Sequence, residues 1–258
     1  MHILPKNLML NKLILLRHGE SRWNQENRFT GWTDVDLTEN GKGEAKNAGV
    51  LLSKNKIEID LIYTSYLKRA IKTNKICLKK IKKPNIEVKC HWRLNERHYG
   101  NLQGLNKLQT AKKYGDKKVL QWRRSYDISP PSMNLDDKRH PRHDILYKNV
   151  DPQKLPSSES LKDTLERVKP LWTNQIIPQI KKGQNIMIVA HGNSLRAIVK
   201  ILKNISDKDI INVNIPTGIP YIFELNDNFD YKKDYYLGNQ KEILKKIENV
   251  SKQGRSKD

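Results

Sequence analysis

The chain has 258 residues, of which 36% are hydrophobic, so it is long enough to bury a sizeable core in one large domain. No apolar run approaches the ~20 residues that cross a bilayer, and residues 1–11 lack the continuous apolar region of a signal peptide, so we expect a cytoplasmic protein with no membrane partner. The net charge of +21 would suit nucleic acid or small anions, but no basic–aromatic motif of a known nucleic-acid module is present, so we expect no nucleic-acid partner.

The first predicted element is a strand at residues 13–16, a continuous apolar run that is typical of a buried strand. Thr38 and Ser65 stand where helix N-caps are expected, and Pro170 predicts a kink in a later helix. Further strands are predicted at 59–63, 86–89, 185–190 and 221–225. Helices are predicted at 38–54, 65–80, 107–114, 117–124, 159–179, 194–203, 207–211 and 239–250.

Between residues 127 and 158 repeated prolines break any long element. Such a long excursion is usually functional when it is ordered. Elsewhere strands alternate with helices, which predicts an α/β fold: a three-layer sandwich with a mainly parallel central sheet and helices on both faces. We expect a single domain at 12–250, preceded by an N-terminal extension at 1–11 and followed by a flexible C-terminal tail at 251–258.

Two predicted strands end in the same way, with a histidine followed by a glycine. Arg17, His18 and Gly19 follow the first strand, and His191 and Gly192 follow a later one. A single histidine at a strand end would be an ordinary turn residue. Because ligands of open α/β sheets bind at the carboxyl ends of the strands, two such histidines are expected to meet over one crevice. A helix that begins there adds backbone N–H groups aimed at an anion.

Four further arginines lie near the ends of predicted elements: Arg69, Arg97, Arg123 and Arg124. Taken one at a time, each is best explained by a solvated helix face. Several guanidinium groups around one crevice instead favour a phosphate ester with more than one charge, because a guanidinium binds phosphate oxygens in a bidentate manner.

Other kinds of site are not supported. The sequence contains neither the phosphate-binding pattern GxxxxGK[ST] nor the dinucleotide-binding pattern GxGxxG. Residues 34–36 begin like a calcium loop, but Glu39 stands at the position that needs glycine. His140 and His143 lie in the proline-rich excursion without a predicted element to fix them, so no metal site is expected.

Residues 15–24, which read LLRHGESRWN, resemble the signature of the histidine phosphatase superfamily. Within it, further segments resemble the 2,3-bisphosphoglycerate-dependent phosphoglycerate mutases: residues 26–32, 94–100, 102–107, 121–124, 190–196 and 214–218. The similarity runs from residue 12 to residue 253. The triplet Arg-His-Gly alone would be weak evidence, but these longer segments are specific.

The resemblance implies a phosphoglycerate mutase-like catalytic domain that interconverts 2-phosphoglycerate and 3-phosphoglycerate. It implies catalytic roles for five residues, with His18 taking the phosphoryl group, Arg17 and Arg69 holding it, His191 stabilising charge, and Glu96 acting as general acid and base. It also implies 2,3-bisphosphoglycerate as a primer, no metal, phosphoglycerates as ligands and a homodimer. The substrate-binding residues that it implies are Arg17, His18, Gly19, Glu20, Ser21, Arg22, Trp23, Asn24, Thr30, Gly31, Arg69, Glu96, Arg97, His98, Tyr99, Lys107, Arg123, Arg124, Gly192 and Asn193.

Two rival functions stay open. One is a phosphatase of the same superfamily that releases phosphate to water; such relatives are typically shorter in the middle, whereas this chain has a long segment at 96–159 that could cover the site. The other is a basic binding protein without enzymatic activity, supported by the charge alone. Arg142 stands where relatives usually carry glycine, which could change the loop. Ser21 and Gly31 match the glycolytic mutases rather than the bisphosphoglycerate synthases.

Overall fold

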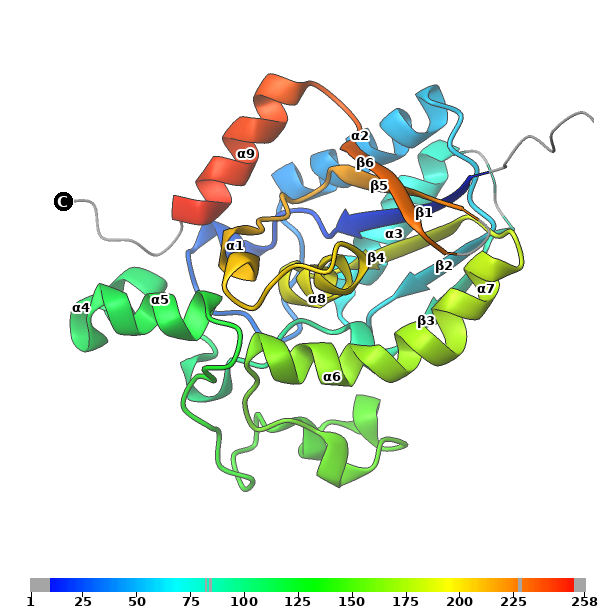
Figure 1. Ribbon diagram of the computed structural model, residues 1–258. Helices are drawn as coiled ribbons and strands as arrows, with labels where there is room; N and C mark the ends of the chain where they lie inside the picture. Colours follow the sequence, from blue (N-terminus) through cyan, green and yellow to red (C-terminus); the bar gives the residue numbers. More distant parts are fainter. Residues whose placement is uncertain (1–9, 82, 84, 227–228, 253–258) are drawn as a thin grey trace, which may run out of the picture.

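The computed structural model describes residues 10–81, 83, 85–226 and 229–252, and a single mixed sheet runs through this part of the chain (Figure 1). Its six strands have the spatial order β3-β2-β4-β1-β5-β6. Neighbouring strands from β3 to β1 are parallel, whereas β5 is antiparallel to both β1 and β6, so the prediction of a mainly parallel sheet is confirmed. The strands are Asn11–Arg17 (β1), Leu61–Thr64 (β2), Glu87–Cys90 (β3), Ile186–Ala190 (β4), Pro220–Leu225 (β5) and Tyr231–Tyr236 (β6).

Helices connect these strands, and most of them begin and end close to the predicted positions. The helices are Arg22–Gln25 (α1), Glu39–Lys54 (α2), Lys68–Ile81 (α3), Lys107–Tyr114 (α4), Asp116–Arg124 (α5), Leu161–Leu171 (α6), Ile177–Lys181 (α7), Gly192–Leu202 (α8) and Gln240–Lys252 (α9). Thr38 caps α2 as predicted, because its Oγ1 accepts from the backbone N–H of Gly41 at 3.0 Å.

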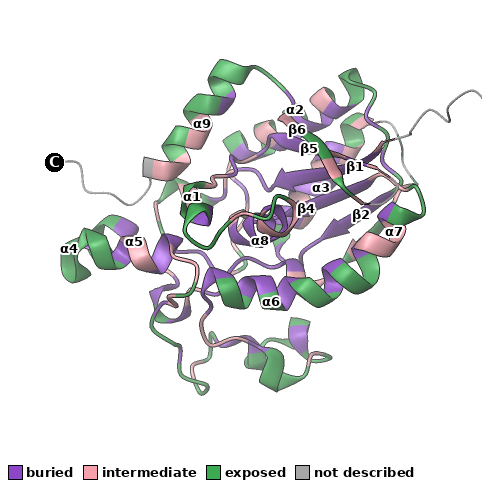
Figure 2. Cartoon of the chain, viewed as in Figure 1, coloured by how far each residue is buried: buried purple, intermediate pink, exposed green. Residues whose placement is uncertain are grey.

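Helices cover both faces of the sheet because its central strands are apolar on both sides. Leu13 and Leu15 of β1 pack in one cluster with α6, α7 and α8, whereas Ile14 and Leu16 pack with α2 and α3 on the opposite face. Figure 2 shows the central strands β1, β2, β4 and β5 buried between helices whose outer surfaces are exposed, whereas the edge strands β3 and β6 are largely not buried. The three-layer α/β sandwich is therefore confirmed.

The helix predicted at 159–179 is divided in the structure. Ser160 caps α6, so the helix starts later than predicted. A π-helical turn, Trp172–Ile176, separates α6 from α7, while Pro170 lies inside α6. Pro178 explains the break, because it lacks the N–H group that an α-helix would direct to the carbonyl four residues earlier.

Two other local predictions differ from the structure, and two elements were not predicted. The helix predicted at 207–211 is a 3₁₀ turn at Asp209–Asn212. Ser65 does not cap a helix directly, since α3 begins only at Lys68 and the Ser65 hydroxyl lies 2.7 Å from Nε2 of His191. The sequence pattern predicts neither α1, which is too short to show a periodicity, nor β6.

The two ends of the chain are more regular than expected. β1 begins at Asn11 and α9 continues to Lys252, so both elements reach into the ranges predicted as an extension and a tail. Residues 1–9 and 253–258 of those ranges lie outside the described residues. None of the described helices combines the length and apolar character that a membrane span requires.

The excursion at 127–158 folds as a lobe of short 3₁₀ turns beside α6 (Figure 1). Tyr147 and Leu155 of this lobe pack against Trp32 and Trp92, which fixes it to the rest of the chain.

Arg142 fits this lobe without strain. It lies in the 3₁₀ turn Pro141–His143, and its backbone is not in the left-handed region that favours glycine. The backbone at this position therefore does not require glycine.

Candidate active site

Two histidines lie side by side at the carboxyl ends of β1 and β4. His18 follows β1 and His191 follows β4, and the centroids of their rings are 4.9 Å apart. The backbone N–H of His18 donates to the carbonyl of Ala190 at 3.0 Å, which ties the ends of the two parallel strands together. The structure thus brings both histidines to one crevice, at the edge where ligands of α/β sheets bind.

His18 presents one ring nitrogen to the pocket as a neutral base. Its Nδ1 lies 2.7 Å from the carbonyl oxygen of Gly19, which can only accept, so Nδ1 carries the ring proton. Nε2 accepts from Nε of Arg69 at 3.3 Å. Burial, followed by the charges of Arg69 and Arg17, holds the pKa of His18 well below its ordinary value of 6.5. At neutral pH the Nε2 lone pair is therefore available to react.

Arg17 and Arg69 flank His18 and are held by backbone carbonyls. Arg69 donates to two carbonyls of segment 31–33, at 2.8 and 2.9 Å, and Arg17 donates to the carbonyl of Ile215 at 2.8 Å. Burial lowers the pKa of Arg69 to about 10, so it remains a cation at neutral pH. Guanidinium groups fixed in this way need little reorganisation when a phosphoryl group binds.

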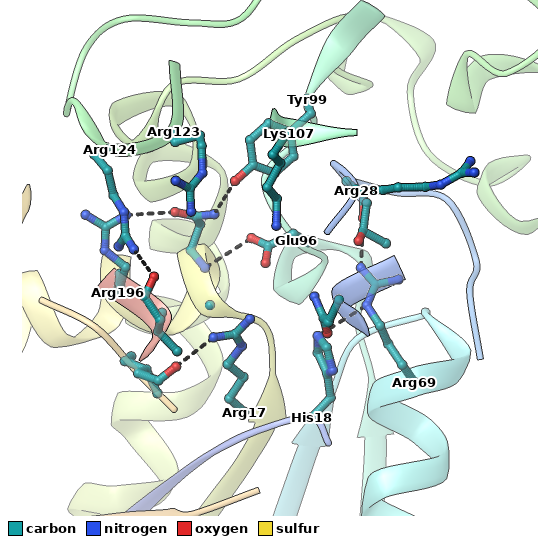
Figure 3. Close-up of a pocket in the computed structure, with 17 residues that line it drawn as sticks. Arg17, His18, Arg28, Arg69, Glu96, Tyr99, Lys107, Arg123, Arg124 and Arg196 are labelled. Carbon is teal, nitrogen blue, oxygen red and sulfur yellow. Dashed lines mark hydrogen bonds between the residues drawn. The ribbon is translucent and has the colours of Figure 1, made fainter. Parts of the chain in front are cut away.

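Glu96 is the carboxylate among the residues that line the pocket. Its Oε1 accepts from the backbone N–H of Arg97 at 2.8 Å and from that of Asn193 at 3.0 Å. Because Asn193 lies in the first turn of α8, the amino end of this helix helps to hold the carboxylate. Figure 3 shows Glu96 between His18 and the cations on the opposite side of the pocket.

A second group of cations, Lys107, Arg123 and Arg124, lies across the pocket from His18 (Figure 3). All three are buried. Burial and the charge of Arg123 hold the pKa of Lys107 well below its ordinary value, and the same two causes lower the pKa of Arg124 to about 9. Because a nearby anion favours the charged forms, this arrangement suits a ligand with a second anionic group far from His18.

The pocket is lined by most of the residues that the resemblance assigns to substrate binding. Those that line it are Arg17, His18, Asn24, Thr30, Gly31, Arg69, Glu96, Tyr99, Lys107, Arg123, Arg124, Gly192 and Asn193. Those that the structure does not bring to the lining are Gly19, Glu20, Ser21, Arg22, Trp23, Arg97 and His98. Residues that line it without having been assigned are Arg28, Arg196, Ile215 and Val250.

Several residues outside the lining support residues within it. Ser21 caps α1 and accepts from the backbone N–H of Asn24 at 3.3 Å. Arg97 lies behind Tyr99 and donates to its hydroxyl at 3.1 Å. His98 is buried, and its backbone N–H donates to a carboxylate away from the pocket. Ser21 and Arg97 thus hydrogen-bond to residues of the lining, whereas His98 does not.

Residues 19–23 do not line the pocket, and the first two of them contact α2. A Cβ on Gly19 would lie 2.1 Å from the carbonyl oxygen of Gly41, so only glycine allows β1 to approach α2 this closely. The backbone N–H of Glu20 donates to Glu44 at 2.8 Å. Arg22 is exposed and Trp23 is half-buried.

His191 lies behind His18 and is not part of the pocket lining. Its Nε2 is 2.7 Å from the hydroxyl of Ser65, while its Nδ1 has no hydrogen-bond partner among the described residues. Burial, followed by the charge of Arg69, holds the pKa of His191 well below 6.5. The ring is therefore neutral at neutral pH and packs against His18.

The lining residues that were not predicted from the sequence differ in whether a sequence pattern could have indicated them. Arg196 lies three residues after Asn193 on α8 and donates to its Oδ1 at 2.8 Å, so helical spacing could have indicated it. The carbonyl of Val250 accepts from Arg124 at 2.8 Å, a contact that only the packing of α9 creates. Arg28 points away from the other labelled cations in Figure 3, and it lies within the motif at residues 26–32, which could have indicated it.

The two histidines of the proline-rich lobe form hydrogen bonds to other residues of the same lobe. Nε2 of His140 lies 3.1 Å from the hydroxyl of Ser157, and Nε2 of His143 lies 2.8 Å from the carbonyl of Leu135. Within the described ranges, no three His, Cys, Asp or Glu side chains gather as metal ligands.

Comparison with known proteins identifies close relatives of this chain. The sequence model of the histidine phosphatase superfamily (branch 1) matches residues 13–232. The 2,3-bisphosphoglycerate-dependent phosphoglycerate mutases of Elusimicrobium minutum and Bacteroides fragilis are each 55% identical over 248 residues, which is 96% of this chain and 100% of theirs. The protein of the same name from Porphyromonas gingivalis is 53% identical over 248 residues, again 96% of this chain and 100% of its own.

Solved structures share the fold at lower identity. A mycobacterial hydrolase superposes with a TM-score of 0.68 at 22% identity, covering 89% of this chain and 99% of that one. The YhfR protein of Bacillus stearothermophilus gives a TM-score of 0.64 at 24% identity, covering 86% and 94%. At such identities the likeness concerns the fold alone, whereas the family follows from the sequence matches. The chain belongs to the histidine phosphatase superfamily and, within it, to the family of the 2,3-bisphosphoglycerate-dependent phosphoglycerate mutases.

Proposed function

We propose that the protein is a phosphoglycerate mutase that interconverts 2-phosphoglycerate and 3-phosphoglycerate through a phosphohistidine on His18. The observation that carries the proposal is the neutral imidazole of His18, whose Nε2 faces a pocket lined by fixed guanidinium groups. Relatives that are 55% identical over nearly the whole chain bear the name of this activity.

The side chains divide the chemistry into two balanced steps. First, the free hydroxyl of a bound monophosphoglycerate attacks the phosphorus carried by His18, Glu96 takes the hydroxyl proton, and the bond to Nε2 breaks, which regenerates 2,3-bisphosphoglycerate. Then the Nε2 lone pair of His18 forms a bond to the phosphorus at the other position, the ester bond there breaks, and Glu96 gives its proton to the released glycerate oxygen. Arg17 and Arg69 neutralise the phosphoryl oxygens in both steps, and His191 stabilises charge from behind His18.

We propose that 2,3-bisphosphoglycerate loads His18 and that no metal is needed. Among the described lining residues, seven basic side chains stand against one carboxylate, Glu96. Nε of Arg17 is buried and has no hydrogen-bond partner within the described part of the chain. Such an excess of cations fits a ligand with two phosphates and a carboxylate. The residues that would hold its far end are Tyr99, Lys107, Arg123 and Arg124, with Asn24, Thr30, Gly31, Gly192 and Asn193 completing the pocket.

We further propose that the protein is cytoplasmic, acts as a homodimer, and forms one catalytic domain that extends from β1 to α9. The single sheet and its two helical layers support the one-domain proposal. The dimer rests on the resemblance to the family, and light scattering of the purified protein tests it directly. A monomeric mass would contradict it.

The activity itself is tested by measuring 2-phosphoglycerate formation from 3-phosphoglycerate and phosphate release in parallel, with and without catalytic 2,3-bisphosphoglycerate. We expect conversion to depend on the primer and to exceed phosphate release, because Arg123 and Arg124 keep the substrate in place for the return step. Phosphate release that is faster than isomerisation would assign the protein to the phosphatases instead.

A further inference from the structure

A buried ion pair, Arg167–Glu159, lies directly behind the segment that carries Glu96. Nε of Arg167 donates to Oε1 of Glu159 at 2.5 Å, and Nη2 donates to Oε2 at 2.9 Å. The two side chains are only 5% and 3% exposed. A buried ion pair adds little stability over apolar packing of the same volume, so its place in the fold needs another explanation.

Arg167 directs its other N–H groups to the backbone around Glu96. Nη1 donates to the carbonyl of Arg93 at 2.7 Å, and Nη2 donates to the carbonyls of Asn95 and Glu96 at 3.2 and 3.1 Å. Because the guanidinium is a rigid planar fork, these contacts and the ion pair together hold the segment in one geometry.

Glu159 holds the same segment on its far side. Its Oε2 accepts from the backbone N–H of His98 at 2.8 Å. The ion pair therefore contacts the main chain before Glu96, at Glu96 and two residues after it. These contacts fix the main chain at Glu96 and therefore the direction of its side chain. On the pocket side, its Oε1 accepts from the backbone N–H groups of Arg97 and Asn193.

Trp32 completes this arrangement. Its Nε1 donates to the carbonyl of Glu96 at 2.5 Å, and the guanidinium carbon of Arg167 lies 5.3 Å from the centroid of its ring. Trp32 follows Gly31, whose carbonyl accepts from Arg69 at 2.8 Å. One cluster thus connects the Glu96 segment to the guanidinium beside His18.

We propose that Arg167 and Glu159, together with Trp32, are positioning residues that set where the Glu96 carboxylate stands relative to the glycerate oxygens. None of the three lines the pocket, so they act through Glu96 and not on the substrate. The inference rests on the proposed function, in which Glu96 gives and takes the proton.

The test compares two phosphoryl donors in the variant Arg167→Lys. Lysine keeps the charge beside Glu159 but cannot reach all the carbonyls that Arg167 holds. Transfer from 2,3-bisphosphoglycerate to His18 releases an alkoxide that needs a proton, whereas transfer from p-nitrophenyl phosphate releases a phenolate that leaves without one. We expect the variant to slow phosphoenzyme formation from 2,3-bisphosphoglycerate by about 10- to 100-fold and that from p-nitrophenyl phosphate by less than about twofold.

Trp32→Phe provides a milder test, because it removes one hydrogen bond to the carbonyl of Glu96 and keeps an aromatic ring. It should lower the same rate selectively and by a smaller factor. Glu96→Gln is the reference and should show the largest difference between the two donors. Lys200→Met is the matched control: Lys200 also joins a carboxylate, Asp207 at 2.7 Å, to a backbone carbonyl, but it neither lines the pocket nor contacts the Glu96 segment in a described hydrogen bond, and both rates should be unchanged.

Equal slowing with both donors would reduce Arg167 to a general structural role and overturn the proposal, as would an unchanged rate with 2,3-bisphosphoglycerate in both variants. If Arg167→Lys does not fold, Trp32→Phe decides by the same criteria. Failure of the proposed function is seen separately, because the unmodified protein would then either form no phosphoenzyme from 2,3-bisphosphoglycerate or release phosphate faster than it isomerises phosphoglycerates.

Discussion

The surroundings of His18 and His191 lower the pKa values of both imidazole rings. Both rings are buried beside Arg69, and the two effects act in the same direction, because burial disfavours a charged imidazole and the guanidinium repels it. A neutral His18 can act as a nucleophile near neutral pH, whereas a protonated one cannot.

The two rings should therefore remain neutral as the pH falls through 6.5. Below that value the unfolded chain binds protons that the folded protein does not, so these residues make the free energy of unfolding decrease as the pH is lowered. Ring resonances in NMR titrations and urea unfolding at several pH values measure both effects. In a variant with asparagine at both positions, part of this pH dependence should disappear. A ring that titrates near 6.5 would contradict the assignment.

In the segment from Glu96 to Tyr99, the sequence motif does not reveal which side chains line the pocket. Glu96 and Tyr99 line the pocket, whereas Arg97 and His98 do not. Their orientation depends on partners far along the chain: Arg97 donates to the carbonyl of Arg123 at 2.6 Å. The motif identifies the segment, but these long-range hydrogen bonds decide which of its side chains reach a ligand.

At the scale of elements, β1 and β4 could be predicted because they are apolar on both faces, and the matching residues that follow them indicate the site. β6 could not be predicted in the same way. Its Asp234 accepts hydrogen bonds from Tyr221 and Tyr231, so a polar strand is held by side chains that come together only in the folded sheet.

Helix α9 lies beside the pocket and is held at two points. Lys246 forms an ion pair with Glu44 at 2.7 Å, and the carbonyl of Val250 accepts from Arg124 at 2.8 Å. Figure 1 shows the last turn of α9 approaching the end of α5. The helix thus covers the cations that would hold the far end of the substrate.

A chain that ends at Lys245 should release more phosphate relative to isomerisation. This truncation keeps the buried anchor Ile243 but removes both contacts, so water gains access to the phosphohistidine and Arg124 loses a partner. We expect the ratio of the two rates to rise by roughly tenfold, as loss of positioning does elsewhere. A chain that ends at Lys252 keeps α9 and serves as the control. An unchanged ratio in the shorter chain would remove α9 from this role.

For the whole molecule, the charge of +21 leaves several classes of partner open, and the structure shows where part of that charge gathers. Arginines from β1, α3, α5 and α8 converge on one pocket although they are far apart in the sequence. The resemblance indicates most of this set because long motifs carry those residues. It does not indicate Val250, because a backbone carbonyl at the end of a helix is placed by packing and not by residue type.

The proposed function requires that His18 carries the phosphoryl group and passes it to a glycerate hydroxyl. The most direct measurement is to load the protein with labelled 2,3-bisphosphoglycerate, isolate the phosphoenzyme and add unlabelled 3-phosphoglycerate. We expect an acid-labile, base-stable label that is absent in His18→Ala and that moves into phosphoglycerates much faster than into free phosphate. Label on a serine, label that persists in His18→Ala, or transfer mainly to water would contradict this role of His18.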